Sequence, residues 1–233
     1  MSDPALFSAL EERLGVHFTD RDLLQQVFIH RSYLNEHKNF PLDHNERLEF
    51  LGDAVLELVV TDYLYRNFPN PEGELTIWRS SLVKGDTLAE VARDLAFPDY
   101  LQVSRGEEKS GGKEKGYLLA NALEALIGAT YLDQGYDSAK HVIEGFILSR
   151  LPAILEQKLY IDPKSRLQEL TQEKFGFTPQ YSVVDQVGPD HAKEFTVTVS
   201  IQDREIGRGV GASKQSAQVA AAAEALRALQ PEA

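Results

Sequence analysis

The sequence predicts an all-α domain followed by a small α+β domain, and three observations support this division. Residues 5–151 repeat apolar side chains at spacings of three and four, which is typical of amphipathic helices around a core. Residues 195–201 alternate apolar and polar side chains, the two-residue period of a β-strand with one buried face. An alanine-rich helical segment follows. We therefore expect domains at 1–151 and 162–231, joined by a linker at 152–161. The modest periodicity of residues 153–161 also allows a last turn of helix there.

The helices of the first domain are predicted from apolar spacing and from start and stop signals. Leu6, Leu10 and Leu14 form the first apolar stripe. Thr19 followed by Asp22 predicts the cap and the acidic first turn of the next helix. Prolines and glycines mark the loops: Pro69, Pro71, Gly73 and Gly111-Gly112.

The helix that begins near Asn45 carries three acids on one face. At 100° per residue, Glu46, Glu49 and Asp53 fall within an arc of about 60°, opposite an apolar face that includes Leu51. Like charges at this spacing repel one another, whereas a face chosen for solubility would more naturally interleave lysine or arginine. A divalent cation would remove the repulsion. Spacing alone leaves two alternatives open, a metal site or an acidic surface without a function.

A second predicted helix, over 117–133, repeats this arrangement. Asn121 and Glu124 stand three residues apart, opposite a face that includes Leu119 and Leu123. If the polar faces of the two helices meet at a cleft, four carboxylates and one amide converge there. Oxygen ligands suit Mg²⁺ or Mn²⁺, and the lack of cysteine and of Glu-x-x-His spacing disfavours zinc and di-iron chemistry.

The second domain is predicted as a helix, three strands and a helix. Asp162-Pro163 is typical of the cap and first position of a helix that continues to about Phe175. Ser213 is expected to cap a final helix that ends near Leu229. The strands and turns between these helices are expected in this order: 180–187, Gly188-Pro189-Asp190, 195–201, Gln202-Asp203 and 204–211.

Composition and charge restrict the class of protein. Apolar residues make up 42% of the 233 residues, enough for a packed core, and the absence of cysteine excludes disulfides and thiolate zinc sites. No membrane span or secretory signal is recognisable, so we expect a soluble cytoplasmic protein without a membrane partner. The net charge of −12 disfavours a nucleic-acid partner at first sight. However, residues 160–233 carry eight basic and ten acidic side chains, a net charge of only −2.

Several other residues have a structural explanation that we favour over a functional one. His30 and His44 are expected to cap or pack, since a site for a hard cation does not need imidazole. Trp78 is expected in the core. The glycines at 207, 209 and 211 lack the lysine and the βαβ context of a phosphate loop, which favours a bulge or tight turn. Phosphate contact and plain solvation are equally open for three lysines: Lys109, Lys113 and Lys115.

Several segments of the chain resemble the ribonuclease III family. Asn45 to Leu56, NERLEFLGDAVL, is similar to the signature of that family. Further similar segments are Ile29 to Tyr33, Gly106 to Gly112 (GEEKSGG) and Leu119 to Asp133. Residues of the second domain are similar to its double-stranded RNA-binding domain in Lys164 to Glu169, Gly188 to His191 and Gly209 to Lys214. The resemblance covers nearly the whole chain and implies an all-α nuclease domain followed by an RNA-binding domain.

The resemblance also implies the roles of individual residues. The metal ligands would be Glu49, Asp53, Asn121 and Glu124, with Asp53 and Glu124 the most critical for catalysis. Glu46 and Glu72 would lie beside the RNA, and Phe50 would insert into the second subunit of a homodimer. In the second domain, Gln168 and His191 would reach the minor grooves of the duplex, and Lys214 would meet a phosphate.

The implied activity is Mg²⁺-dependent hydrolysis of both strands of double-stranded RNA. Staggered cuts would leave 5′-phosphate and 3′-hydroxyl ends, in ribosomal RNA precursors and some messenger RNAs. Mg²⁺ can activate water and stabilise the leaving oxygen, so no protein nucleophile is needed. One alternative is a double-stranded RNA-binding regulator with an impaired nuclease centre, because Asn121 stands where the family commonly has Asp. Another is a metal-binding helical domain unconnected with RNA.

Overall fold

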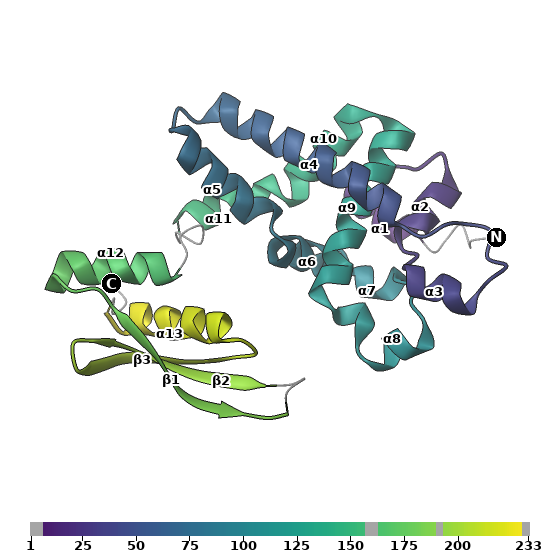
Figure 1. Ribbon diagram of the computed structural model, residues 1–233. Helices are drawn as coiled ribbons and strands as arrows, with labels where there is room; N and C mark the ends of the chain where they lie inside the picture. Colours follow the sequence, from purple (N-terminus) through teal and green to yellow (C-terminus); the bar gives the residue numbers. More distant parts are fainter. Residues whose placement is uncertain (1–6, 157–162, 190–192, 230–233) are drawn as a thin grey trace. The chain divides into compact units, whose positions relative to one another are not determined.

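The chain folds into two units, a helical one and one that combines two helices with a sheet (Figure 1). This computed structural model describes residues 7–156, 163–189 and 193–229. The first unit spans Met1–Tyr160 and the second Ile161–Ala233. The fold class predicted from the sequence is therefore confirmed. Within the described residues, no helix combines the length and the apolarity that a membrane span requires.

The first unit is built from helices throughout its described part. In chain order they are α1 (Ser8–Leu14), α2 (Arg21–Val27), α3 (Arg31–Glu36), α4 (Glu46–Asn67), α5 (Glu72–Val83), α6 (Gly85–Asp94), α7 (Phe97–Tyr100), α8 (Arg105–Lys109), the 3₁₀ turn η1 (Gly112–Glu114), α9 (Gly116–Gln134), α10 (Tyr136–Phe146), the 3₁₀ turn η2 (Leu148–Arg150) and α11 (Leu151–Glu156). The helix predicted over 117–133 is confirmed as α9.

Helix α9 forms the centre of this unit, and α4 runs across it (Figure 1). It also packs against α2, α6 and α10, so its residues are apolar on nearly all sides. Leu119, Leu123 and Leu126 are fully buried there. Trp78 is buried and its ring contacts Phe68 edge-on, which confirms the expected place of the tryptophan in the core.

One local expectation for the first unit is wrong, and the structure decides between the two alternatives for part of another. Asp20, not Thr19, caps α2, because the Asp20 carboxylate accepts hydrogen bonds from the backbone N–H groups of Asp22 and Leu23. For the start of the segment at 152–161 the structure bears out the last turn of helix, since α11 extends to Glu156 and buries Ile154 against the first core. The rest of that segment lies outside the described residues.

The second unit packs two helices on one face of an antiparallel sheet (Figure 1). Its elements are α12 (Pro163–Phe175), β1 (Gln180–Val187), β2 (Glu194–Ile201), β3 (Arg204–Gly211) and α13 (Lys214–Leu229), and the strand order is β1-β2-β3. Val197 and Val199 point into the core, as their alternation with polar residues predicts. The Ser213 hydroxyl accepts from the N–H of Ser216, which confirms the predicted cap of α13.

The three spaced glycines of β3 serve close packing against α13. A Cβ atom added to Gly209 would lie 2.1 Å from the backbone nitrogen of Ala221, and one added to Gly207 would lie 2.6 Å from its carbonyl oxygen. The expected tight turn is wrong, since both glycines lie inside a strand. The expected bulge is confirmed nearby, because the β2–β3 register shifts between Val199 and Ser200.

Candidate active site

Two glycines allow α4 and α9 to cross in backbone contact. A Cβ atom at Gly52 would lie 1.7 Å from the carbonyl oxygen of Glu124, and one at Gly128 would lie 2.2 Å from the carbonyl oxygen of Leu48. Larger residues would force the helices apart. The crossing therefore brings the backbone of Glu124 directly against the residue that precedes Asp53.

The acidic faces of α4 and α9 meet beside this crossing. Glu46, Glu49, Phe50 and Asp53 of α4 line an open hollow of about 410 Å³ together with Glu124 of α9. Asn121 lies next to it, lining a smaller hollow of about 60 Å³ that also contacts Glu46 and Glu49. Helical spacing predicted the two polar faces and left their meeting as a condition, which the structure fulfils.

Burial and mutual repulsion raise the pKa values of two acids in this hollow, which we call the acidic hollow. Burial raises the pKa of Glu124 to about 7, and the charges of Asp53 and Glu49 act in the same direction. Burial also raises the pKa of Glu49, with a further contribution from the charge of Glu46. Carboxyl groups with raised pKa values that share a hollow are candidates for a functional site.

The side chain of Asn121 is hydrogen-bonded to Glu49. This bond lowers the pKa of Glu49 and so opposes the effects of burial and of Glu46. An aspartate in place of Asn121 would instead place another negative charge beside Glu49. The amide thus stabilises the acidic hollow when no cation is bound, while its oxygen remains a possible ligand.

The chemistry of these donors fits a hard divalent cation. All four candidate ligands offer oxygen atoms, and three of them are carboxylates that repel one another. Among the described residues, no three His, Cys, Asp or Glu side chains already form a closed cluster that could hold a metal ion. Mg²⁺ does not require one, because it usually keeps several waters and binds through one or two carboxylates together with phosphate oxygens of the substrate.

We expect the affinity of the acidic hollow for Mg²⁺ to rise between pH 6 and pH 8. With a pKa of about 7, Glu124 holds its proton below that pH, and a cation must displace the proton. The ordinary pKa of a glutamate is near 4.5. The raised pKa of Glu124 therefore stabilises the metal-free fold at low pH, and this stabilisation is lost when the pH rises through about 7. Calorimetric Mg²⁺ titrations at three pH values measure the change, and an affinity independent of pH would contradict it.

The start of α4 is anchored to the segment that follows α2. The buried Asn45 donates its backbone N–H to the carbonyl of Ile29 at 2.9 Å, and its side-chain amide to the carbonyl of Val27 at 2.9 Å. The backbone N–H of His30 donates in turn to the carbonyl of Gln102 at 3.0 Å. These bonds fix the first turn of α4, which carries Glu46 and Glu49.

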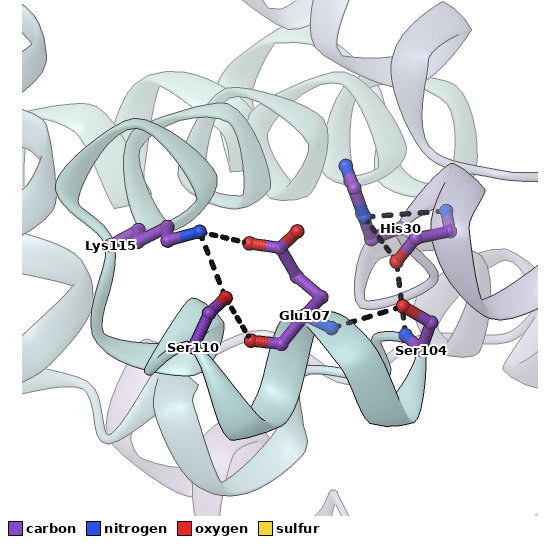
Figure 2. A network of polar contacts seen from close by, with 6 residues as sticks. His30, Ser104, Glu107, Ser110 and Lys115 are labelled. Atoms are coloured by element: carbon purple, nitrogen blue, oxygen red, sulfur yellow. Dashed lines mark hydrogen bonds and ion pairs between the residues drawn. The ribbon is translucent and has the colours of Figure 1, made fainter. Parts of the chain in front are cut away.

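A polar network, shown in Figure 2, anchors the segment before α9. His30 caps α3 through its contact with Ser32, whose hydroxyl accepts from the N–H of Ser104. Lys115, the residue before α9, donates to the Glu107 carboxylate at 2.6 Å and to the Ser110 hydroxyl at 3.2 Å. The capping role expected for His30 is confirmed, and burial lowers its pKa.

Two of the three lysines of the glycine-rich segment form ion pairs with carboxylates. Lys113 pairs with Glu108 at 3.2 Å, and Lys115 belongs to the network just described. Both lysines are thus balanced by carboxylates of their own segment, which favours a structural role over free contact with phosphates.

His44 lies between Asp43 and Glu46, at 3.7 and 3.8 Å, and packs beside the first turn of α4.

The remaining described candidate residues do not line the acidic hollow. Glu72 is exposed at the start of α5, where its carboxylate accepts from Thr76 and lines a different hollow. Gln168 on α12 and Lys214 at the start of α13 are exposed in the second unit. His191 lies outside the described residues. Within one chain, Glu72 therefore lines a different hollow from the four acids of α4 and α9.

Comparison with known proteins agrees with this architecture. The family described as "Ribonuclease-III-like" matches residues 20–151, and the "Double-stranded RNA binding motif" matches residues 163–229. "Ribonuclease 3" of Enterococcus faecalis is 43% identical over 97% of this chain and 99% of that protein. The chain belongs to the ribonuclease III family. "Ribonuclease 3" of Streptococcus thermophilus is 42% identical over 94% of this chain and 96% of that protein.

The structural comparison concerns the first unit of this ribonuclease III family member. The nuclease domain of ribonuclease III from Campylobacter jejuni superposes with a TM-score of 0.58 at 40% identity, covering 63% of this chain and 99% of that one. A second structure of the same nuclease domain has a TM-score of 0.57 at 39% identity and covers 65% and 98%. The helical unit described above is therefore the ribonuclease III nuclease fold.

Reasoning from the sequence missed the residues that make the crossing. Gly52 and Gly128 have no side chain with chemistry of its own, and their importance follows only from the partner helix. A signal was present, since a glycine inside a long helical segment usually has a packing reason. The network around Glu107 was also missed, because its members come from two segments far apart in the sequence, 30–32 and 104–115.

Proposed function

We propose that this member of the ribonuclease III family is a homodimeric, Mg²⁺-dependent endoribonuclease that leaves 5′-phosphate and 3′-hydroxyl ends in staggered cuts. Its action on double-stranded RNA follows from its family and its RNA-binding motif. The single observation that carries the proposal is the acidic hollow, where Glu49, Asp53 and Glu124 share one opening. A regulator with an impaired centre is not favoured, because these three carboxylates are all present.

Glu49, Asp53 and Glu124 would hold the cation through carboxylate oxygens, and Asn121 through its amide oxygen. When bound, the cation supplies Lewis-acid stabilisation of the charge that develops on the phosphate during hydrolysis. The chain's own contacts hold these ligands in position. The Gly52 crossing holds α9 against α4, and the hydrogen bonds of Asn45 hold the first turn of α4. No protein nucleophile is required, because a bound cation can activate water.

The second unit would supply most of the phosphate contacts. Lys214 stands at the first turn of α13, where the helix dipole and free N–H groups attract an anion. Gln168 is exposed on α12 and would reach a minor groove of the duplex, where shape and 2′-hydroxyls are recognised. His191 stays a prediction for the second groove. The net charge of −2 favours modest affinity.

Incubation of the purified chain with a long RNA duplex tests the proposed function. We expect cleavage into short duplexes in Mg²⁺, no cleavage with chelator, and fragments that a 5′-phosphate-dependent exonuclease degrades. Binding without cleavage in Mg²⁺ and in Mn²⁺ would favour the regulator instead. Ribosomal RNA precursors and some messenger RNAs stay the proposed natural substrates, and a cytoplasmic location stays a prediction.

The homodimer is supported by an apolar stripe along α4. Phe50 is 82% exposed, and Leu58 and Tyr65 are also exposed on the same side of the helix, about two turns apart in each step. Beyond Tyr65 the stripe leads to an apolar hollow of about 600 Å³, which also includes Phe68 and Glu72. The similar nuclease domain of Campylobacter jejuni is described as structurally flexible in a region involved in dimer formation.

Pairing two copies would also explain the position of Glu72. Phe50 borders the acidic hollow, and Glu72 borders the apolar one at the other end of α4. If Phe50 of one copy entered the apolar hollow of the second, Glu72 of that second copy would come beside the acidic hollow of the first. Each centre would then contain the acids that one chain keeps apart.

We expect Phe50→Ala to weaken the dimer. Removing a large exposed aromatic side chain from the centre of an interface typically costs about 2 kcal/mol or more, which is about a thirtyfold change in the dissociation constant. Sedimentation at micromolar concentration measures the shift towards a monomer of 26.0 kDa. Leu132→Ala is the control, since Leu132 is 56% exposed on α9 and lines neither hollow. A parent protein that sediments as a monomer would contradict the dimer.

A further inference from the structure

An exposed tyrosine stands beside the acidic hollow in a place where the proposed metal site does not need it. Tyr117 belongs to the first turn of α9, and its side chain is 57% exposed. At 100° per residue, Tyr117, Asn121 and Glu124 fall within an arc of about 60°, so they share one face of the helix. This exposure leaves the ring and hydroxyl of Tyr117 accessible to a bound molecule.

The surroundings of Tyr117 connect it to the acids. It lines the hollow of about 60 Å³ together with His30, Glu46, Glu49 and Asn121. Tyr117 therefore lines the same hollow as two of the candidate metal ligands, Glu49 and Asn121. A substrate that places a phosphate in the acidic hollow passes close to this ring.

Other polar groups around this small hollow are already engaged within the protein. The Asn45 amide donates to the Val27 carbonyl, and the Asn121 amide is bonded to Glu49. Two nearby cations are also paired, Arg31 with Glu46 at 3.5 Å and Lys115 with Glu107 at 2.6 Å. The Tyr117 hydroxyl has no hydrogen bond with another residue of the described part of the chain.

A neutral donor suits this position. A phenol O–H is a neutral donor, so it lacks the strong attraction to Glu46 and Glu49 that would engage a lysine here. Contacts of this kind, from tyrosine among others, form much of the binding to phosphate and sugar oxygens in protein–nucleic acid complexes.

We infer that Tyr117 is a substrate-binding residue whose hydroxyl donates a hydrogen bond to a sugar–phosphate oxygen of the RNA strand next to the bond that is cut. The acceptor is either a phosphate oxygen or a 2′-hydroxyl, which share this chemistry. The inference rests on the proposed nuclease function. It adds a contact that the ionised carboxylates of the acidic hollow cannot supply, because they only accept hydrogen bonds and repel phosphates.

The variant Tyr117→Phe tests this inference because it removes the hydroxyl and keeps the ring. We expect kcat/KM on a short RNA duplex to fall about three- to tenfold, the value of one hydrogen bond, mainly through KM. The Mg²⁺ concentration for half-maximal rate and the melting temperature should not change. Tyr131→Phe is the matched control, since Tyr131 lies on α9 too, 37% exposed and about 20 Å further along the helix.

A duplex with single 2′-deoxy nucleotides beside the cut distinguishes the two acceptors. If a 2′-hydroxyl accepts, the deoxy substitution and Tyr117→Phe cause the same loss and their effects do not add. If a phosphate accepts, the two losses add. Equal kcat/KM for Tyr117→Phe and the parent, or an equal loss in Tyr131→Phe, would overturn the inference.

Failure of the proposed function gives a different result. In that case the parent protein does not cleave the duplex at all, and the affinity of the metal-free protein for the duplex decides about Tyr117. A several-fold weaker affinity of Tyr117→Phe would still support the contact, whereas equal affinities would overturn it.

Discussion

Glu124→Gln should lower the cleavage rate about 10³-fold or more while leaving duplex binding intact. A cation that acts as a Lewis acid contributes several kcal/mol to the transition state, and each ~1.36 kcal/mol is a factor of ten in rate. Glutamine keeps the size of the side chain but loses the negative charge that holds the cation. Single-turnover cleavage at saturating Mg²⁺ measures the loss, and a gel-shift titration without metal measures binding.

Because the pKa of Glu124 is raised, this variant distinguishes a loss of catalysis from a loss of stability. At pH 8 the parent carries a charge that burial and the neighbours Asp53 and Glu49 disfavour, and glutamine removes it. The metal-free variant should therefore melt no lower than the parent, so that lost activity cannot be attributed to unfolding. Glu144→Gln on α10 is the control, because that exposed glutamate lines neither hollow of the site. A Glu124→Gln enzyme with a tenth of the parent rate would contradict the assignment.

Helical periodicity was sufficient to predict the two acidic faces, and strand alternation the central strand of the sheet. The spacing of Glu49 and Asp53, and of Asn121 and Glu124, depends only on the geometry of one helix. Likewise, the alternation around Val197 depends only on the geometry of one strand. Such features are local in sequence, and the structure contains them with the expected bounds to within a residue or two.

Features that depend on two segments could not be predicted in this way. The crossing of α4 and α9 requires that Gly52 meets the backbone of a residue some seventy positions later. Capping by Asp20 in place of Thr19 depends on Asp133, whose carboxylate holds the N–H groups of both residues at 2.8 and 2.9 Å. The hydrogen bond between Asn121 and Glu49 also joins different helices, so its effect on the Glu49 pKa was invisible in the sequence.

Gly52→Ala should damage both stability and activity, although alanine is the better helix former. Its higher helix propensity favours α4 by about 1 kcal/mol. The added Cβ, however, would lie 1.7 Å from the Glu124 carbonyl oxygen and 2.9 Å from the backbone nitrogen of Gly128, where ordinary contact begins near 3.4 Å. These atoms are backbone and cannot rotate away, so α9 must move by more than about 1 Å. Overpacking of this kind costs about 3 kcal/mol or more, which exceeds the gain in propensity.

The displaced helix carries Asn121 and Glu124, so the movement separates them from Glu49 and Asp53. A misplacement of about 1 Å can reduce a rate about 100-fold, and a net loss of about 2 kcal/mol should lower the melting temperature by about 4–8 °C. Thermal melts and single-turnover cleavage below the transition measure the two effects separately. Gly145→Ala on α10 is the matched control, because nothing lies within 4 Å of its added Cβ and the same substitution should stabilise that helix slightly. A Gly52→Ala protein that melts and cleaves like the parent would show that the close crossing does not position the acids.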